Sequence, residues 1–286
     1  MSPARYLRLT RAALWSLAII VYTGAAVRLT GSGLGCHDWP NCNEDELVPD
    51  ASYHGWIEFG NRMFTGVVAL AVVGAVLGSR RRSPHRVDLV RLSWGLVAGV
   101  IAQILLGALL VRTDLDPRFT MGHFLLSMVL LWNAAVLHHR AGLQGEPTRG
   151  REVSPVRRLT LVVFWAGAAV LVLGTIVTGS GPHSGSDDES VAHRLPFELR
   201  EVTRIHSISA LVLVAAVGGV LWMAHTRGLL PVRRAAQTVV SLLGAQIALG
   251  YWQYFAGVPE VLVFVHIVMA TIAWVAIVRL DLEASR

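Results

Sequence analysis

The sequence predicts an all-α integral membrane protein with eight transmembrane helices, arranged as two pseudo-symmetric four-helix bundles. Three observations support this fold class. The 286 residues are 53% hydrophobic and only 15% charged, which excludes an ordinary soluble domain. Eight apolar segments are long enough to cross a bilayer. Two short motifs each occur twice, once in each half of the chain.

The eight apolar segments are each about 18–21 residues long. In lipid they must be helical, because every backbone polar group there needs a partner within the protein. Their approximate limits are 12–30, 59–78, 93–112, 119–138, 159–179, 205–224, 236–255 and 261–279.

The repeated motifs divide the chain into two related halves. Gln103 begins Gln-Ile-Leu-Leu-Gly and precedes His123 by 20 residues, and Gln246 begins Gln-Ile-Ala-Leu-Gly and precedes His266 by the same interval. The tetrapeptide Thr-Gly-Ser-Gly also occurs twice, at positions 30 and 178.

We therefore expect an N-terminal half over residues 1–140, a cytoplasmic linker over 141–158 and a C-terminal half over 159–286. Four helices in each half is an even number, so both halves have the same orientation and form a parallel repeat.

The distribution of arginine predicts the orientation. All 25 cationic residues are Arg, and most lie near the termini and in the connections after the second, fourth and sixth segments. The positive-inside rule then predicts a multi-pass protein of the cell membrane with both termini in the cytoplasm. The first segment follows Arg5, Arg8 and Arg11 as in a signal peptide, but no small-residue cleavage site closely follows it, so we expect a retained helix. The arginines form no continuous basic face, which argues against a nucleic-acid partner.

The two cysteines lie in the first outer loop, which spans roughly residues 31–58. Cys36 and Cys42 would face an oxidising compartment, so we expect a disulfide between them. A Cys-x5-Cys metal site is the alternative, but it lacks a second pair of ligands.

Two intramembrane histidines in the C-terminal half suggest a metal site. His206 and His266 should lie at the same shallow depth on neighbouring helices, as bis-imidazole ligation of a haem iron requires. An interhelical hydrogen bond is the alternative for a single histidine, but the matched pair favours the haem. Zinc or copper would need three or four ligands.

The corresponding positions of the N-terminal half are Asn61 and His123, with Glu58 one helical turn before Asn61. This half therefore offers one strong iron ligand and an open position, which suits oxygen chemistry. The Glu58 carboxylate could relay protons or stabilise a cationic intermediate. The alternative for Glu58 is a solvated residue at the membrane surface.

The remaining polar residues near the outer side carry weaker signals. Arginines near the outer ends of three segments could pair with haem propionates or with acidic loop residues; they are Arg28, Arg62 and Arg204. Four outer-loop histidines are expected in solvent, and these are His37, His54, His183 and His193.

Several of these motifs resemble the haem A synthase family. Arg-Leu-Thr-Gly-Ser-Gly-Leu at 28–34, followed by Cys36, Asp-Trp-Pro at 38–40 and Cys42, is similar to the first outer loop of that family. Glu-Phe-Gly-Asn-Arg at 58–62 is similar to the start of its second helix, and the three intramembrane histidines match its histidine positions. The resemblance covers nearly the whole chain.

The resemblance implies a membrane enzyme that oxidises the C8 methyl of haem O to a formyl group by successive hydroxylations, giving haem A for cytochrome c oxidase. It implies a haem b between His206 and His266 that passes electrons, ligation of the substrate haem O by His123, and catalytic support from Glu58. A haem O synthase would supply the substrate. The electron donor is not identified by the sequence, and a homo-oligomer is compatible with it.

One position departs from the family pattern. Many members have Glu-x-x-His where this chain has Glu58-x-x-Asn61, so the usual partner of His123 is missing. Asn61 and Arg62 thus become candidates for the substrate pocket. The alternative function is a di-haem cytochrome b that only transfers electrons, to or from quinone for example. It predicts equivalent bis-histidine sites in both halves, and Asn61 counts against it. A third possibility is a transporter, which predicts broken helices at the membrane midplane, whereas the polar residues here cluster at the outer edge.

Overall fold

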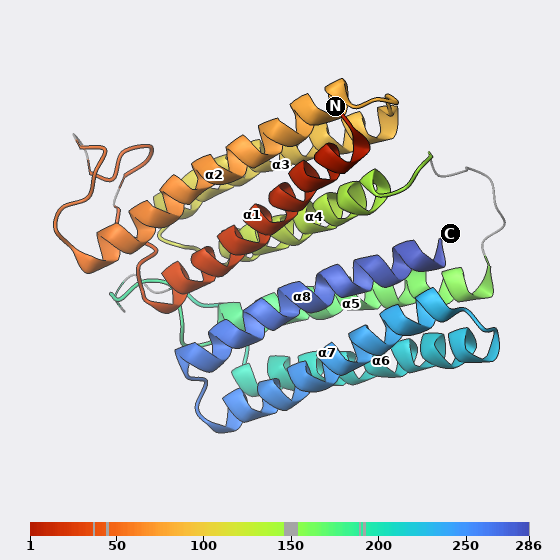
Figure 1. Cartoon of the computed structure of the whole chain (residues 1–286). Coiled ribbons are helices and arrows are strands. Elements are labelled where there is room, and N and C mark those ends of the chain that lie inside the picture. Colours follow the sequence, from red (N-terminus) through yellow and green to blue (C-terminus); the bar gives the residue numbers. More distant parts are fainter. Residues whose placement is uncertain (37, 44–45, 146–153, 189, 191–192, 286) are drawn as a thin grey trace.

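The computed structural model describes the chain except for residues 37, 44–45, 146–153, 189, 191–192 and 286 (Figure 1). Its described part forms eight long α-helices. Their bounds are α1 (Pro3–Leu29), α2 (Tyr53–Arg81), α3 (Val87–Arg112), α4 (Pro117–Ala141), α5 (Pro155–Ser180), α6 (Leu199–Thr226), α7 (Leu230–Phe255) and α8 (Glu260–Ala284). Of the expected linker over 141–158, residues 146–153 lie outside the described residues, and residues 155–158 belong to the first turn of α5.

The helices form two groups of four that lie side by side (Figure 1). In the first group, α1 packs against α2 and α4, and α3 completes the ring between α2 and α4. In the second group, α5 packs against α6 and α8, and α7 lies between α6 and α8. Helices α4 and α8 make the largest of the contacts between the groups, which also include α4 with α5 and α1 with α8. Between α4 and α8, the indole N–H of Trp274 donates to the Met128 carbonyl at 2.9 Å.

In both groups, helices two apart in the chain lie diagonally across the bundle and not next to each other. Helix α2 does not pack against α4, and α6 does not pack against α8, within the described residues. The expectation that His206 and His266 lie on neighbouring helices is therefore wrong. They lie on helices that face each other across the bundle, because each ring closes in chain order.

The helices extend beyond the apolar segments predicted from the sequence. Helix α1 begins at Pro3 rather than near residue 12, and α8 ends at Ala284 rather than near 279. Hydropathy detects the part that suits hydrocarbon, whereas capping groups set the true ends. Ser2, Ser52, Asp116 and Ser154 each accept a backbone N–H in the first turn of α1, α2, α4 and α5. Arg118 hydrogen bonds also hold the pKa of the Asp116 carboxyl at about 2.

Seven of the eight described helices are long and apolar enough to cross a membrane. The exception is α7, which carries Arg233, Arg234 and several glutamines within its length. Large apolar side chains such as Leu70, Trp165 and Val261 are exposed on the bundle surface, as expected where lipid surrounds the protein. The chain is therefore a multi-pass membrane protein.

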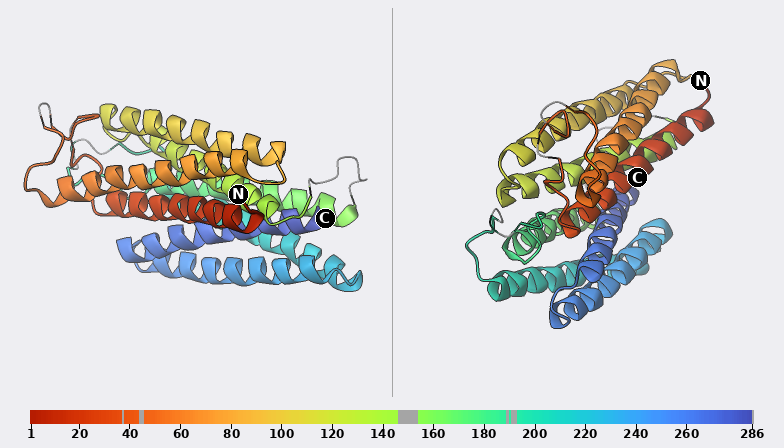
Figure 2. Two further views of the ribbon diagram at one scale, coloured as in Figure 1. Left: turned by 45° about the horizontal axis from the view of Figure 1, so that its top comes forward. Right: turned by 90° about the vertical axis from the view of Figure 1, so that its left-hand side faces the viewer.

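Two long loops meet at one end of the molecule, opposite the chain termini (Figure 1, Figure 2). The first connects α1 to α2 and the second connects α5 to α6. The Arg28 guanidinium donates to the carbonyls of Thr178 and His183, at 3.2 and 2.8 Å. The Gly33 N–H donates to the Gly185 carbonyl at 2.8 Å. The two halves are thus joined at this end as well as between α4 and α8.

The loop histidines differ from the expectation of simple solvation. The side chain of His183 is only 17% exposed, and its Nε2–H donates to the Val258 carbonyl at 2.8 Å. His54 Nδ1 lies 2.9 Å from the Ser32 hydroxyl. The expectation for His183 was wrong because the loops pack on each other, whereas the side chain of His54 is 35% exposed. His193 is exposed, as expected, and His37 lies outside the described residues.

Candidate functional site

The imidazole rings of His206 and His266 face each other inside the second helix group. Their ring centroids are 6.5 Å apart and their planes are inclined by 64°. Two metal–imidazole bonds of about 2 Å each, plus roughly 1 Å from each nitrogen to its ring centre, would give about 6 Å between centroids. The observed separation therefore fits one metal ion held between the rings.

Two glycines, each on a helix that packs against one of the histidine-bearing helices, leave space for these imidazole rings. A Cβ atom at Gly174 of α5 would lie 3.1 Å from Cε1 of His206, and one at Gly250 of α7 would lie 3.3 Å from Cε1 of His266. The Nδ1 atoms of both rings are buried and lack a well-formed hydrogen bond to any described residue. The two side chains thus keep capacity for a ligand that the fold itself does not satisfy.

The donor set suits a macrocycle-bound iron better than a bare metal ion. The described residues include no group of three or more His, Cys, Asp or Glu that could hold a metal. A zinc site would need such a group. Iron in a haem takes four nitrogens from the porphyrin and needs only two from the protein, so the residues present fit a haem.

The first helix group holds one partly buried histidine, His123, at the equivalent place. His123 of α4 has its Nδ1 buried without a well-formed hydrogen bond. A Cβ at Gly107 of α3 would lie 3.7 Å from its Cε1. Asn61 of α2, which is diagonal to α4, accepts a hydrogen bond at its Oδ1 from Thr23 at 2.7 Å. No hydrogen bond between Asn61 and His123 is present among the described residues.

Glu58 is buried, so its interpretation as a solvated surface residue was wrong. Only 6% of the Glu58 surface is exposed. Its Oε2 accepts the Cys36 backbone N–H at 2.8 Å, and its Oε1 accepts two hydrogen bonds from Arg62, at 2.6 and 3.1 Å. The loop after α1 covers the carboxylate, and Arg62 balances its charge.

Arg62 also holds that loop in place. Its Nη1 donates to the carbonyls of Asp38 and Asn41, at 2.9 and 3.0 Å. Those acceptors lie inside the short loop closed by the disulfide between Cys36 and Cys42, which forms as expected. Of the three candidate arginines, Arg62 thus pairs with an acidic residue and Arg28 with loop carbonyls, whereas Arg204 is exposed two residues before His206.

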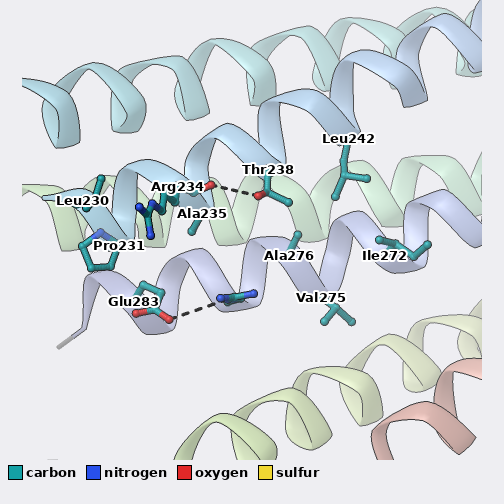
Figure 3. A pocket seen from close by; sticks show the side chains of 11 residues that line it. Leu230, Pro231, Arg234, Ala235, Thr238, Leu242, Ile272, Val275, Ala276 and Glu283 are labelled. Carbon is teal, nitrogen blue, oxygen red and sulfur yellow. Dashed lines mark hydrogen bonds and ion pairs between the residues drawn. The ribbon is translucent and has the colours of Figure 1, made fainter. Parts of the chain in front are cut away.

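A groove of about 480 Å³ lies elsewhere, between α7 and α8 (Figure 3). Its lining runs from Leu230 to Leu242 on α7 and from Ile272 to Glu283 on α8, and the Arg279–Glu283 ion pair crosses one side of it. His266 lies nearer the other end of α8. None of the residues proposed from the sequence lines this groove.

Sequence reasoning did not assign a role to two glutamines that contact the histidine-bearing helices. The Gln246 side-chain amide donates to the His266 backbone carbonyl at 2.9 Å, and that of Gln103 donates to the His123 carbonyl at 3.0 Å. The sequence did indicate these glutamines, because each precedes its histidine by the same interval of 20 residues. Gly174, in contrast, stands in no repeated motif.

Fold and site define an all-helical, multi-pass membrane protein whose paired, partly buried histidines fit a haem. The family model described as cytochrome oxidase assembly protein, COX15-CtaA, matches residues 8–54 and 48–278. The chain belongs to this family, and the family implies haem as the group concerned.

Individual relatives carry two kinds of name. A protein named heme A synthase from Symbiobacterium thermophilum is 29% identical over 87% of this chain and 85% of its own length. One of the same name from Geobacillus kaustophilus is 35% identical over 37% of this chain, and the match spans 33% of that relative. A protein named protoheme IX farnesyltransferase, from Thermus thermophilus, is 28% identical over 95% of this chain but only 47% of its own length.

Proposed function

We propose that this protein is a haem A synthase. It oxidises the C8 methyl of haem O to a formyl group, giving haem A for cytochrome c oxidase. Family membership and relatives named heme A synthase support this proposal. The structural observation that carries it is the difference between the halves. His206 and His266 face each other at 6.5 Å, whereas the equivalent places of the first half hold His123 and Asn61.

The proposed architecture is two pseudo-symmetric halves that share one orientation. Residues 1–140 form the substrate half, 159–286 the haem b half, and 141–158 a cytoplasmic linker. In this arrangement α7 also crosses the membrane, which makes eight spans in total, although α7 is less apolar than the other helices. The closing of both helix rings in the same chain order supports the repeat. Both termini then lie in the cytoplasm.

In the C-terminal half, His206 and His266 hold a haem b. The two rings come from diagonal helices, and their centroids lie 6.5 Å apart. When bound there, haem b supplies one-electron transfer toward the substrate half.

In the N-terminal half, His123 holds the iron of haem O and Glu58 assists the oxidation. Each hydroxylation inserts one oxygen atom of O₂ into a C–H bond and consumes two electrons and two protons, with water as the second product. A second hydroxylation gives a gem-diol, which loses water to leave the formyl group. Glu58 can donate or accept protons, and Asn61 would be a much weaker ligand than a histidine for the iron that His123 would hold. Arg62 lies beside Glu58 and completes this pocket.

A haem O synthase is the proposed supplier of substrate. Haem O is protoheme that carries a farnesyl-derived tail, so its formation needs a farnesyl transfer. The Thermus relative named protoheme IX farnesyltransferase aligns with nearly all of this chain through less than half of its own length. That relationship supports a physical association between the two activities.

The test is co-expression with a haem O synthase in a host that makes no haem A, followed by haem extraction and chromatography. The proposal expects haem A or its hydroxylated precursor. Haem b alone, with haem O unconsumed even after candidate reductants are added, would instead support the di-haem electron-transfer cytochrome.

A further inference from the structure

We propose that Gln246 and Gly250 of α7 position His266, and that Gln103 and Gly107 of α3 position His123. We call each Gln-x3-Gly pair a histidine seat. The inference rests on the proposed ligation of haem by these histidines. It assigns a function to a motif whose repetition neither the fold nor the reaction explains.

Each seat holds its histidine at two points. The glutamine amide donates to the histidine backbone carbonyl, at 2.9 Å for Gln246 and 3.0 Å for Gln103. The glycine, one helical turn later, faces the imidazole itself, at 3.3 Å for Gly250 and 3.7 Å for Gly107 when measured from a Cβ placed there. The glutamine hydrogen bond therefore fixes the backbone of the histidine-bearing helix, and the glycine determines where the imidazole ring can lie.

The hydrogen bond has a defined direction. The histidine carbonyl can only accept, so the glutamine must present its NH₂ group to it. The Oε1 atoms of Gln103 and Gln246 are buried and have no hydrogen-bond partner among the described residues. An inverted amide would turn that oxygen toward the carbonyl oxygen and create repulsion. A buried acceptor without a hydrogen bond costs free energy. Both halves bear this cost at the glutamine Oε1 atom, and the hydrogen bond to the histidine carbonyl offsets it.

The two seats differ in a way that matches their proposed roles. Gln103 also donates to the Ser127 hydroxyl at 2.7 Å, and that hydroxyl donates to the His123 carbonyl at 3.0 Å. Position 270, which corresponds to Ser127 in the second half, is alanine. The backbone at His123 is thus held twice while its ring has more space. The ring of His266 is packed more closely, as suits a permanent ligand.

Gly174 provides the matching contact for His206. A Cβ there would lie 3.1 Å from the His206 ring, which is closer than the contact at Gly250. Among the described residues, no glutamine side chain donates to the His206 carbonyl as Gln246 does to the carbonyl of His266. Partners that orient a metal ligand commonly affect affinity by about 10–100-fold, so displacing either ring should weaken haem b binding measurably.

The experiment measures haem b in purified variants by low-temperature EPR and by the rate of haem loss to apomyoglobin. Gly174→Ala and Gly250→Ala should shift the low-spin g values and accelerate haem loss about 10-fold, with the larger effect at Gly174. Gly244→Ala, on α7 with open space around it, is the matched control and should equal wild type.

Gln246→Leu tests the hydrogen bond separately and keeps the test open if a glycine variant does not fold. Gln237→Leu, at an exposed position of the same helix, is its control. We expect faster haem loss for the first and wild-type behaviour for the second. If Gln246→Leu and the folded glycine variants have wild-type g values and wild-type rates of haem loss, the proposal that Gln246 and Gly250 position His266 is wrong. Low-spin haem b retained in His266→Ala would instead refute the proposed ligation.

Discussion

The carboxylate of Glu58 and the guanidinium of Arg62 form a buried ion pair one turn apart on α2. Two hydrogen bonds of 2.6 and 3.1 Å join them, and the same guanidinium reaches carbonyls of the disulfide loop. The side chain proposed to handle protons is therefore also part of the contact that closes this loop over the helix. Its chemical and structural contributions can be separated by substitution.

Glu58→Gln should abolish haem A formation while leaving haem b in place. A glutamine oxygen can still accept the Cys36 N–H, but the side chain cannot exchange a proton near neutral pH. Extracted haems and the low-spin haem b spectrum are the two measurements. Glu201→Ala, at an exposed position of α6, serves as the control. Unchanged haem A yield in Glu58→Gln would refute the catalytic role.

Arg62→Ala should destabilise the protein strongly, because it leaves the Glu58 charge buried without its partner. Loss of one member of a buried pair costs about 3–5 kcal/mol. The double variant Glu58→Gln with Arg62→Ala should be more stable than Arg62→Ala alone. Denaturant titration in detergent provides the free energies of unfolding. Additive effects of the two substitutions would show that the pair is not coupled.

Asn61→His should fold and convert the substrate haem toward six-coordination. Position 61 lies on α2, diagonal to His123 on α4, as His206 lies diagonal to His266. The substitution also removes the Thr23–Asn61 hydrogen bond of 2.7 Å, so a small loss of stability is expected. The readout is the optical spectrum of the haem O-loaded protein. An unchanged spectrum would mean that residue 61 does not face the iron.

Removal of the disulfide should loosen the loop that covers Glu58. The bridge joins residues six apart in sequence, and closing a loop of that size is worth about 2 kcal/mol by chain entropy. Cys36→Ser with Cys42→Ser should therefore lower stability by about that amount and increase proteolysis between α1 and α2. Wild-type protein should take up a thiol reagent only after reduction. Labelling before reduction would contradict the bridge.

Much of the fold could be predicted because the membrane restricts the choice of structure. Apolar length located all eight helices, and arginine placement assigned the loops to two ends. Helix limits could not be read from hydropathy, since polar turns continue α1 back to Pro3 and capping side chains end that extension. The weakest prediction was the span at α7, whose polar residues reduce its hydropathy.

The roles of the candidate site residues stay predictions, and several of the contacts that these residues make could not be predicted from the sequence. The spacing between Gln246 and His266 was visible, but not that the amide would bond to the backbone carbonyl. Burial of Glu58 and of the His183 side chain was missed for one reason. Both depend on loops that fold back over helix ends, and such packing between distant segments has no periodic signal in the sequence.

The most direct test of the account is the optical and EPR spectrum of the purified protein beside His206→Ala and His266→Ala. The account predicts one low-spin, bis-histidine haem b in the wild type. It predicts loss of that signal in each variant, whereas His123→Ala should retain it. A normal low-spin spectrum in both His206→Ala and His266→Ala, or its loss in His123→Ala alone, would contradict the division of the two halves into an electron-transfer site and a substrate site.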